Sequence, residues 1–108
     1  EEQALVICMM SDVKGHFLGD KILTRGTATG SLVTPREIFM EALRRHAVSL
    51  ILIHNHPSGD PMPSREDILV TQRIREGGSL LGIELLDHII IGDNCYVSLA
   101  EQKLLKEK

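Results

Sequence analysis

The sequence predicts an α/β domain in which a mixed β-sheet is flanked by helices. Strand-like apolar segments alternate along the chain with segments whose apolar residues recur every three or four positions. Their order, strand-strand-helix-strand-helix-strand-strand, places crossover helices around one central strand and hairpins at both ends. With 108 residues, 43% apolar and 25% charged, the chain has the size and composition of one globular domain.

The first half of the chain predicts a hairpin followed by a helix. Residues 4–11 and 16–27 are apolar segments on either side of a short turn-forming stretch. Thr34 is a suitable N-cap, Pro35 suits the first helical position, and Glu37 supplies the acid three residues after the cap. The apolar side of this helix consists of Ile38, Phe39, Ala42, Leu43 and Ala47.

The second half predicts a central strand, a loop and a second helix. Residues 48–53 are continuously apolar, which is typical of a strand covered on both faces. The proline-rich residues 55–63 must form a loop, and a helix then begins at Ser64. The pair Gly77-Gly78 is expected to weaken or end that helix. The last predicted elements are a closing hairpin at residues 84–92 and 95–97 and a short terminal helix at residues 100–106.

Composition and charge exclude several classes of protein. A net charge of −3 and only three aromatic residues lack the basic surface and the stacking platforms of a nucleic-acid binder. No apolar run approaches the ~20 residues of a membrane helix, and no signal-peptide pattern opens the chain. Cys8 and Cys95 lie too far apart for a metal knuckle, and both are expected to be buried apolar residues in a reducing compartment. We therefore expect a soluble, cytoplasmic protein without a membrane partner.

Three candidate metal ligands meet at the predicted carboxyl end of the central strand, where ligands of α/β sheets bind. Residues alternate faces along a strand, so His54 and His56 point to the same side. Seven residues later, Ser64-x-x-Asp67 places a carboxylate one turn into the next helix. Two histidines, one carboxylate and an open position are the donor set of a hydrolytic zinc site.

Each part of this pattern also has a plainer explanation. A His-x-His pair on a strand is more often structural or exposed than metal-bound, and Ser64-x-x-Asp67 is an ordinary helix-capping arrangement. The joint pattern at fixed offsets favours the metal site. A zinc hydrolase also needs a carboxylate as general base. The candidates are Glu1, Glu2, Glu41 and Glu84.

The other three histidines lie outside this pattern. Asp87-His88 stands near the start of an apolar strand and is expected to be a buried structural pair rather than a second site. His16 and His46 have no predicted chemical role.

The spacing His54-x-His56-x7-Ser64-x-x-Asp67 resembles the signature of the JAMM (MPN+) metalloprotease domain, and the whole stretch 54–67 resembles the RadC family of bacterial proteins. The resemblance covers essentially the whole chain. Further similar segments are Arg25-Gly26-Thr27, Pro35-Arg36-Glu37, residues 86–92 and Tyr96-Val97-Ser98. The resemblance implies a three-layer α/β sandwich similar to JAMM and cytidine-deaminase-like domains, with one Zn²⁺ per chain held by His54, His56 and Asp67.

The resemblance also implies roles for two further residues. Ser64 would donate a hydrogen bond to the developing oxyanion or to the metal-bound water. The catalytic glutamate of the family belongs on the first strand, which makes Glu2 the expected base, while Glu1 is one residue out of phase. RadC proteins usually carry an N-terminal helix-hairpin-helix region, which is not found here, so we expect residues 1–108 to form a single JAMM-like domain.

These observations predict a zinc-dependent metallopeptidase that cleaves a peptide or isopeptide bond in a protein or peptide substrate. One alternative is a metal-binding, non-hydrolytic accessory or interaction module associated with DNA repair, although the acidic charge does not support nucleic-acid binding. Another is a phosphodiesterase that uses the same metal. The edge strands of the hairpins could pair two copies of the chain in a homodimer.

Overall fold

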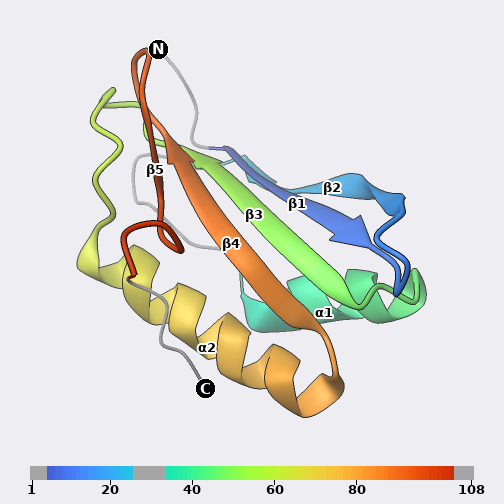
Figure 1. Cartoon of the computed structure of the whole chain (residues 1–108). Coiled ribbons are helices and arrows are strands. Elements are labelled where there is room, and N and C mark those ends of the chain that lie inside the picture. Colours follow the sequence, from blue (N-terminus) through green and yellow to red (C-terminus); the bar gives the residue numbers. More distant parts are fainter. Residues whose placement is uncertain (1–4, 26–33, 104–108) are drawn as a thin grey trace.

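The computed structural model describes residues 5–25 and 34–103. Within these ranges, five strands form one sheet in the order β2-β1-β3-β4-β5, and two helices pack against it (Figure 1). The strands are β1 (Leu5–Ser11), β2 (Phe17–Arg25), β3 (Ser49–Asn55), β4 (Glu84–Ile91) and β5 (Tyr96–Ser98). The helices are α1 (Pro35–Arg44) and α2 (Arg65–Leu81).

The sheet is mixed, as the order of elements predicts. Strand β1 pairs antiparallel with both β2 and β3, and β5 pairs antiparallel with β4. Strands β3 and β4 are parallel, because α2 carries the chain back across the sheet between them. Strand β3 is third of the five strands, so the prediction of an α/β domain around this central strand is confirmed.

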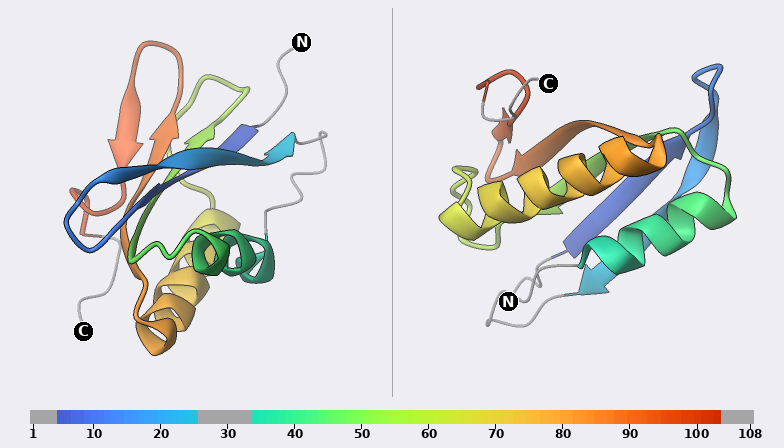
Figure 2. Two further views of the ribbon diagram at one scale, coloured as in Figure 1. Left: turned by 90° about the vertical axis from the view of Figure 1, so that its right-hand side faces the viewer. Right: turned by 90° about the horizontal axis from the view of Figure 1, so that it is seen from below.

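Both described helices lie on the same face of the sheet (Figure 2). The core forms between them and the sheet, and includes Val6, Cys8, Met10, Ile38, Phe39, Ala42, Leu50, Leu52, Ile74 and Leu85. The opposite face carries half-buried apolar side chains, among them Ile7, Met9, Ile51, Ile53 and Ile89. The described part of the chain therefore forms two layers of the predicted sandwich. The prediction that β3 is covered on both faces is wrong for these residues, because burial along β3 alternates and no described helix covers the other face.

Helix α2 runs through Gly77-Gly78, contrary to the expectation that these glycines weaken or end it. A Cβ atom at Gly78 would lie 2.1 Å from the carbonyl oxygen of Ile83, so only glycine lets the helix approach the chain that leads into β4. The tight packing offsets the helix-propensity cost of about 1 kcal/mol for each glycine. The helix ends at Gly82, whose φ of +75° gives the left-handed C-cap.

Two further expectations are corrected. Residues 100–103 form turns instead of the predicted terminal helix, with Lys103 at a φ of 59°, and residues 104–106 lie outside the described residues. Cys8 is buried as expected, but Cys95 is exposed, because it lies in the turn between β4 and β5.

The capping box of Thr34 and Glu37 at the start of α1 is confirmed. Across the described ranges, no helix is both long and apolar enough to cross a bilayer.

Candidate metal centre

Strand β3 brings the two predicted histidine ligands together at its carboxyl end. His54 is on the helix-covered face and is only 6% exposed. His56 follows the last residue of β3, and its backbone N–H donates to the carbonyl oxygen of Ile91 at 2.9 Å, which extends the pairing with β4. The two rings meet edge to face, with centroids 4.8 Å apart. The predicted convergence of the two imidazoles is present in the structure.

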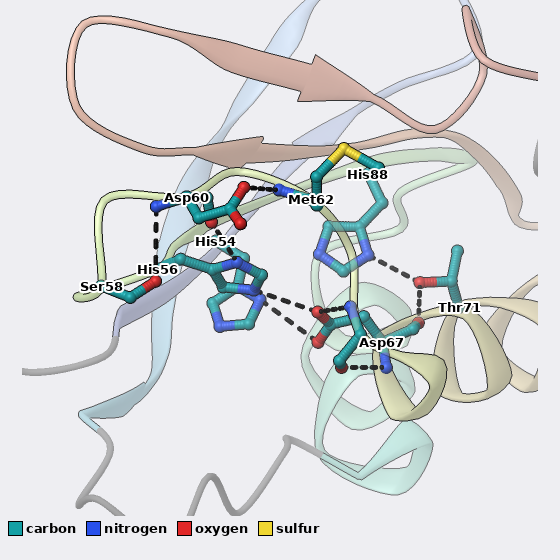
Figure 3. Close-up of polar contacts among 9 residues, drawn as sticks. His54, His56, Ser58, Asp60, Met62, Asp67, Thr71 and His88 are labelled. Atoms are coloured by element: carbon teal, nitrogen blue, oxygen red, sulfur yellow. Dashed lines mark hydrogen bonds and ion pairs between the residues drawn. The ribbon is translucent and has the colours of Figure 1, made fainter.

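Asp67 reaches the same point from the first turn of α2 (Figure 3). Its backbone N–H donates to Ser64 Oγ at 3.0 Å, and its Oδ2 accepts the Ser64 backbone N–H at 2.8 Å. These two hydrogen bonds form the capping box of α2, so the explanation of Ser64-x-x-Asp67 as a helix-capping arrangement also holds. The same carboxylate lies 3.0 Å from His56 Nε2 and 3.7 Å from His54 Nδ1. Capping and ligand placement therefore coexist, and the cap fixes the carboxylate.

Hydrogen bonding determines which nitrogen of His56 carries a proton. Its Nδ1 lies 2.9 Å from the backbone oxygen of Asp60, which can only accept, so Nδ1 carries the hydrogen. In the neutral ring, Nε2 then has a free lone pair directed at the Asp67 carboxylate. Two facing lone pairs need a positive charge between them, either a proton or a metal ion.

The electrostatics of the centre favour the protonation states that a metal requires. Burial lowers the pKa of His54, the Asp67 carboxylate opposes this shift, and the charge of His56 lowers the pKa further. Burial raises the pKa of Asp67, but the hydrogen bonds from Ser64 and the two histidines lower it more, so its net pKa is below the usual value. Neutral imidazole and ionised carboxylate are the metal-binding forms.

The loop that carries His56 is anchored to the turn between β4 and β5. Gly59 donates its N–H to the carbonyl oxygen of His56 at 2.9 Å, and its own carbonyl accepts the Asp93 N–H at 2.8 Å. Gly59 has a φ of +89°, and a Cβ atom there would lie 2.4 Å from an Asp93 carboxylate oxygen. Glycine is therefore favoured by this left-handed conformation, whereas the exposed Asp93 side chain could move aside.

The three ligand atoms of His54, His56 and Asp67 all lie within 4.8 Å of one another, so this group is positioned to bind a metal ion. The family model described as the RadC-like JAB domain matches residues 1–104. The chain belongs to this family. The resemblance to RadC proteins is thereby confirmed.

Relatives of this RadC-like JAB domain are UPF0758 proteins from bacteria and archaea. That of Desulfitobacterium hafniense is 58% identical over 92 residues, which cover 85% of the chain and 40% of the relative. That of Bacillus licheniformis is 56% identical over 99 residues, covering 92% of the chain and 44% of the relative. The Methanosarcina mazei protein is 51% identical over 100 residues, covering 93% and 44%. The chain thus spans less than half the length of these relatives.

Two of the four candidate bases lie far from the metal centre of the RadC-like JAB domain. Glu84 pairs with Ser49 at the start of β3, five residues before His54, which corresponds to about 17 Å along a strand. The Glu41 carboxylate is bound by Arg45 Nε at 2.6 Å and also by Arg44. Arg45 in turn donates to the Leu18 carbonyl, beside the far end of β1.

The other two candidates, Glu1 and Glu2, lie outside the described residues. The described part of β1 begins at Leu5, which pairs with Asn55. Its next residue, Val6, pairs with His54. The first described residues of this RadC-like JAB domain are therefore at the same end of the sheet as the metal centre.

His88 is the residue beside the site that sequence reasoning missed. His88 is buried as expected, and its backbone N–H donates to the Asp87 carboxylate, but the two side chains point to opposite faces of the sheet. The Asp87 carboxylate accepts hydrogen bonds from the Ser98 hydroxyl and from the backbone N–H groups of His88 and Ala100. The His88 ring instead stacks on His54, with centroids 5.8 Å apart. Burial, followed by the charge of His54, lowers the pKa of His88 to about 4.

A sequence signal for His88 does exist. On the helix-covered face of β4, this histidine stands between the buried apolar residues Leu85 and Ile90. A polar side chain in that position needs a polar partner on a neighbouring element. The neighbouring element that supplies this partner becomes known only when β3 is seen to pair with β4.

Proposed function

We propose that this RadC-like JAB domain is a zinc-dependent hydrolase of peptide or isopeptide bonds. The observation that carries the proposal is the arrangement of His54, His56 and Asp67, in which a lone pair on His56 Nε2 faces a carboxylate fixed by the cap of α2. Hydrolytic zinc centres use three such ligands and keep one position open. Zinc bound there would lower the pKa of a coordinated water to about 7 and polarise the scissile carbonyl.

Ser64 is suited to stabilise the charge that develops on the substrate. Its Oγ accepts the backbone N–H of Asp67, and its hydroxyl hydrogen, which also interacts with the Asp67 carboxylate and helps to lower the pKa of that group, can turn to another acceptor. Ser64 is exposed, so a substrate can reach it. We assign its hydroxyl as a donor to the oxygen of the substrate carbonyl as that oxygen becomes negative.

Glu2 is the proposed general base. Support for it comes from β1, which begins at Leu5 beside Asn55, at the end of the sheet where the ligands converge. Glu41 and Glu84 are excluded by their place at the opposite end. The carboxylate of Glu2 would take a proton from the attacking water and deliver it to the leaving amine.

Metal content and peptide hydrolysis together test the proposal. The purified chain would be stripped with a chelator, reconstituted with Zn²⁺ and analysed for bound metal. It would then be incubated with a defined mixture of peptides, and cleavage would be followed by mass spectrometry. We expect one zinc per chain, lost on Asp67→Asn, and cleavage that depends on zinc.

The role of Glu2 is tested separately by Glu2→Gln, with Glu84→Gln as the matched control at the far end of the sheet. Glu2→Gln should retain zinc and lose roughly 10²- to 10⁴-fold in hydrolysis, as general acid-base catalysis contributes. Glu84→Gln should leave hydrolysis unchanged. Zinc well below one per chain after reconstitution would overturn the metal centre, and unchanged hydrolysis in Glu2→Gln would overturn the assignment of the base.

A further inference from the structure

A second polar pair is buried directly behind the candidate ligands. Thr71 on α2 is fully buried and His88 on β4 is 4% exposed. The His88 ring stacks on the ring of His54 with 23° between their planes. The Thr71 hydroxyl lies 2.6 Å from the backbone oxygen of Asp67. This pair therefore contacts two of the three ligand residues (Figure 3).

The directions of the hydrogen bonds follow from the number of hydrogens available. The backbone oxygen of Asp67 only accepts, so the single hydroxyl hydrogen of Thr71 is directed to it. The 2.6 Å contact between Thr71 Oγ1 and His88 Nδ1 must then be a bond that Nδ1–H donates. A continuous chain of hydrogen bonds runs from His88 on β4, through Thr71, to the first turn of α2, where the Asp67 side chain originates.

Packing alone does not account for a histidine in this place. Once Nδ1 carries the hydrogen, Nε2 of the neutral ring is a bare acceptor, and it has no hydrogen-bond partner among the described residues. A buried polar atom without a partner costs about 1–3 kcal/mol. An apolar side chain of similar size would avoid this cost, but it could not donate to Thr71. The histidine therefore contributes two features at this place, an Nδ1–H donor to Thr71 and a flat ring against His54.

We propose that His88 is a positioning residue that holds Asp67, through Thr71, and His54, through direct ring stacking, in the orientation that binds the metal. This inference rests on the proposed metal centre. The hydrogen-bonded Thr71 fixes the peptide group of Asp67 within α2, while the stacked ring restricts rotation of the His54 side chain. Ligands held in this way lose less conformational freedom when a metal ion binds.

The test measures metal affinity in variants that break or preserve this chain of hydrogen bonds. Thr71→Val removes the hydroxyl at nearly constant shape, and Thr71→Ser keeps it. His88→Phe keeps the flat ring without the donor. Zn²⁺ affinity would be measured by competition with a chromophoric chelator, well below the unfolding temperature. The visible absorption of bound Co²⁺ would report the ligand geometry.

We expect Thr71→Val and His88→Phe to lose roughly 10- to 100-fold in Zn²⁺ affinity and to alter the Co²⁺ spectrum, as partners of metal ligands do. Thr71→Ser should recover most of the affinity and the wild-type spectrum. A purely structural role would lower the free energy of unfolding of the metal-free protein without changing the Co²⁺ spectrum, and that result would overturn the inference. Wild-type affinity in both Thr71→Val and His88→Phe would also overturn it.

These outcomes separate the inference from the proposed function. If the wild-type chain binds neither Zn²⁺ nor Co²⁺, the metal centre itself is overturned and the inference falls with it. If the wild type binds and the variants bind equally well, only the positioning role of His88 is overturned.

Discussion

The Oδ2 atom of Asp67 lies 2.8 Å from the backbone nitrogen of Ser64 and thereby closes the capping box of α2. The same oxygen lies 3.0 Å from His56 Nε2. One carboxylate therefore stabilises the start of a helix and contributes to the candidate metal centre. Because the two roles depend on different properties of the side chain, substitution can separate them.

Asp67→Asn should abolish metal binding and leave most of the stability. An amide oxygen can still accept the Ser64 N–H, but a neutral amide is a poor ligand for a divalent transition metal. Asp67→Ala removes both functions and should cost about 1 kcal/mol more in unfolding free energy than Asp67→Asn. Metal analysis and urea unfolding of the metal-free variants measure the two effects. Equal stability of the two variants would contradict the capping role of the side chain.

The adjacent glycines of α2 should respond differently to alanine. At Gly78 the new Cβ would overlap the Ile83 carbonyl oxygen, which is backbone, so we expect Gly78→Ala to lose about 3 kcal/mol of stability. At Gly77 it would lie 3.1 Å from the edge of the Phe39 ring, and the gain of about 1 kcal/mol in helix propensity opposes this contact. Gly77→Ala should thus remain within about 1 kcal/mol of the wild type. Urea unfolding of both variants tests this, and similar losses would contradict it.

Thiol labelling should distinguish the two cysteines. Burial, reinforced by the nearby charge of Glu41, raises the pKa of Cys8 to about 12, so almost no thiolate forms there at pH 8. Cys95 is exposed. A thiol reagent should therefore modify one cysteine in the native protein and two after unfolding, and Cys95→Ser should remove the native reaction. Rapid labelling of native Cys95→Ser would show that Cys8 is accessible.

The sequence predicts much of the fold and the meeting of the three candidate metal ligands because both depend on local patterns. Capping at Thr34 and Ser64 locates the helix starts, and the spacing of His54, His56 and Asp67 depends only on strand alternation and one helical turn. The continuation of α2 through Gly78 could not be found in this way. It depends on a contact with Ile83, which no helix-propensity argument contains.

His88 shows the same limit at the site. Its neighbour Asp87 suggests a local pair, but the pleat of β4 separates the two side chains, and the actual partners of His88 are Thr71 on α2 and His54 on β3. Those contacts arise from the parallel pairing of β3 and β4 and from the position of α2 over them. Contacts between elements that are distant in sequence require the topology before they can be inferred.

The metal-free protein should lose stability as the pH falls from about 6.5 towards 4. Burial lowers the pKa of folded His88 from 6.5 to about 4. Above pH 6.5 the ring is neutral in both states, whereas between these values the unfolded chain takes up a proton that the folded one does not. The free energy of unfolding therefore has its full value above pH 6.5, the pKa in the unfolded chain. It falls by about 1.4 kcal/mol per pH unit between pH 6.5 and about 4, or roughly 3 kcal/mol in total.

His88→Asn isolates this contribution, because an asparagine amide can still donate to Thr71 but does not titrate. The pKa of His54 is also lowered by burial and acts in the same direction, so the variant should retain part of the pH dependence. The measurement is the urea unfolding free energy of both proteins, in the presence of a chelator, between pH 7.5 and 4.5. We expect a shallower slope for His88→Asn. Identical slopes would mean that the His88 ring takes up its proton as readily in the folded protein as in the unfolded chain.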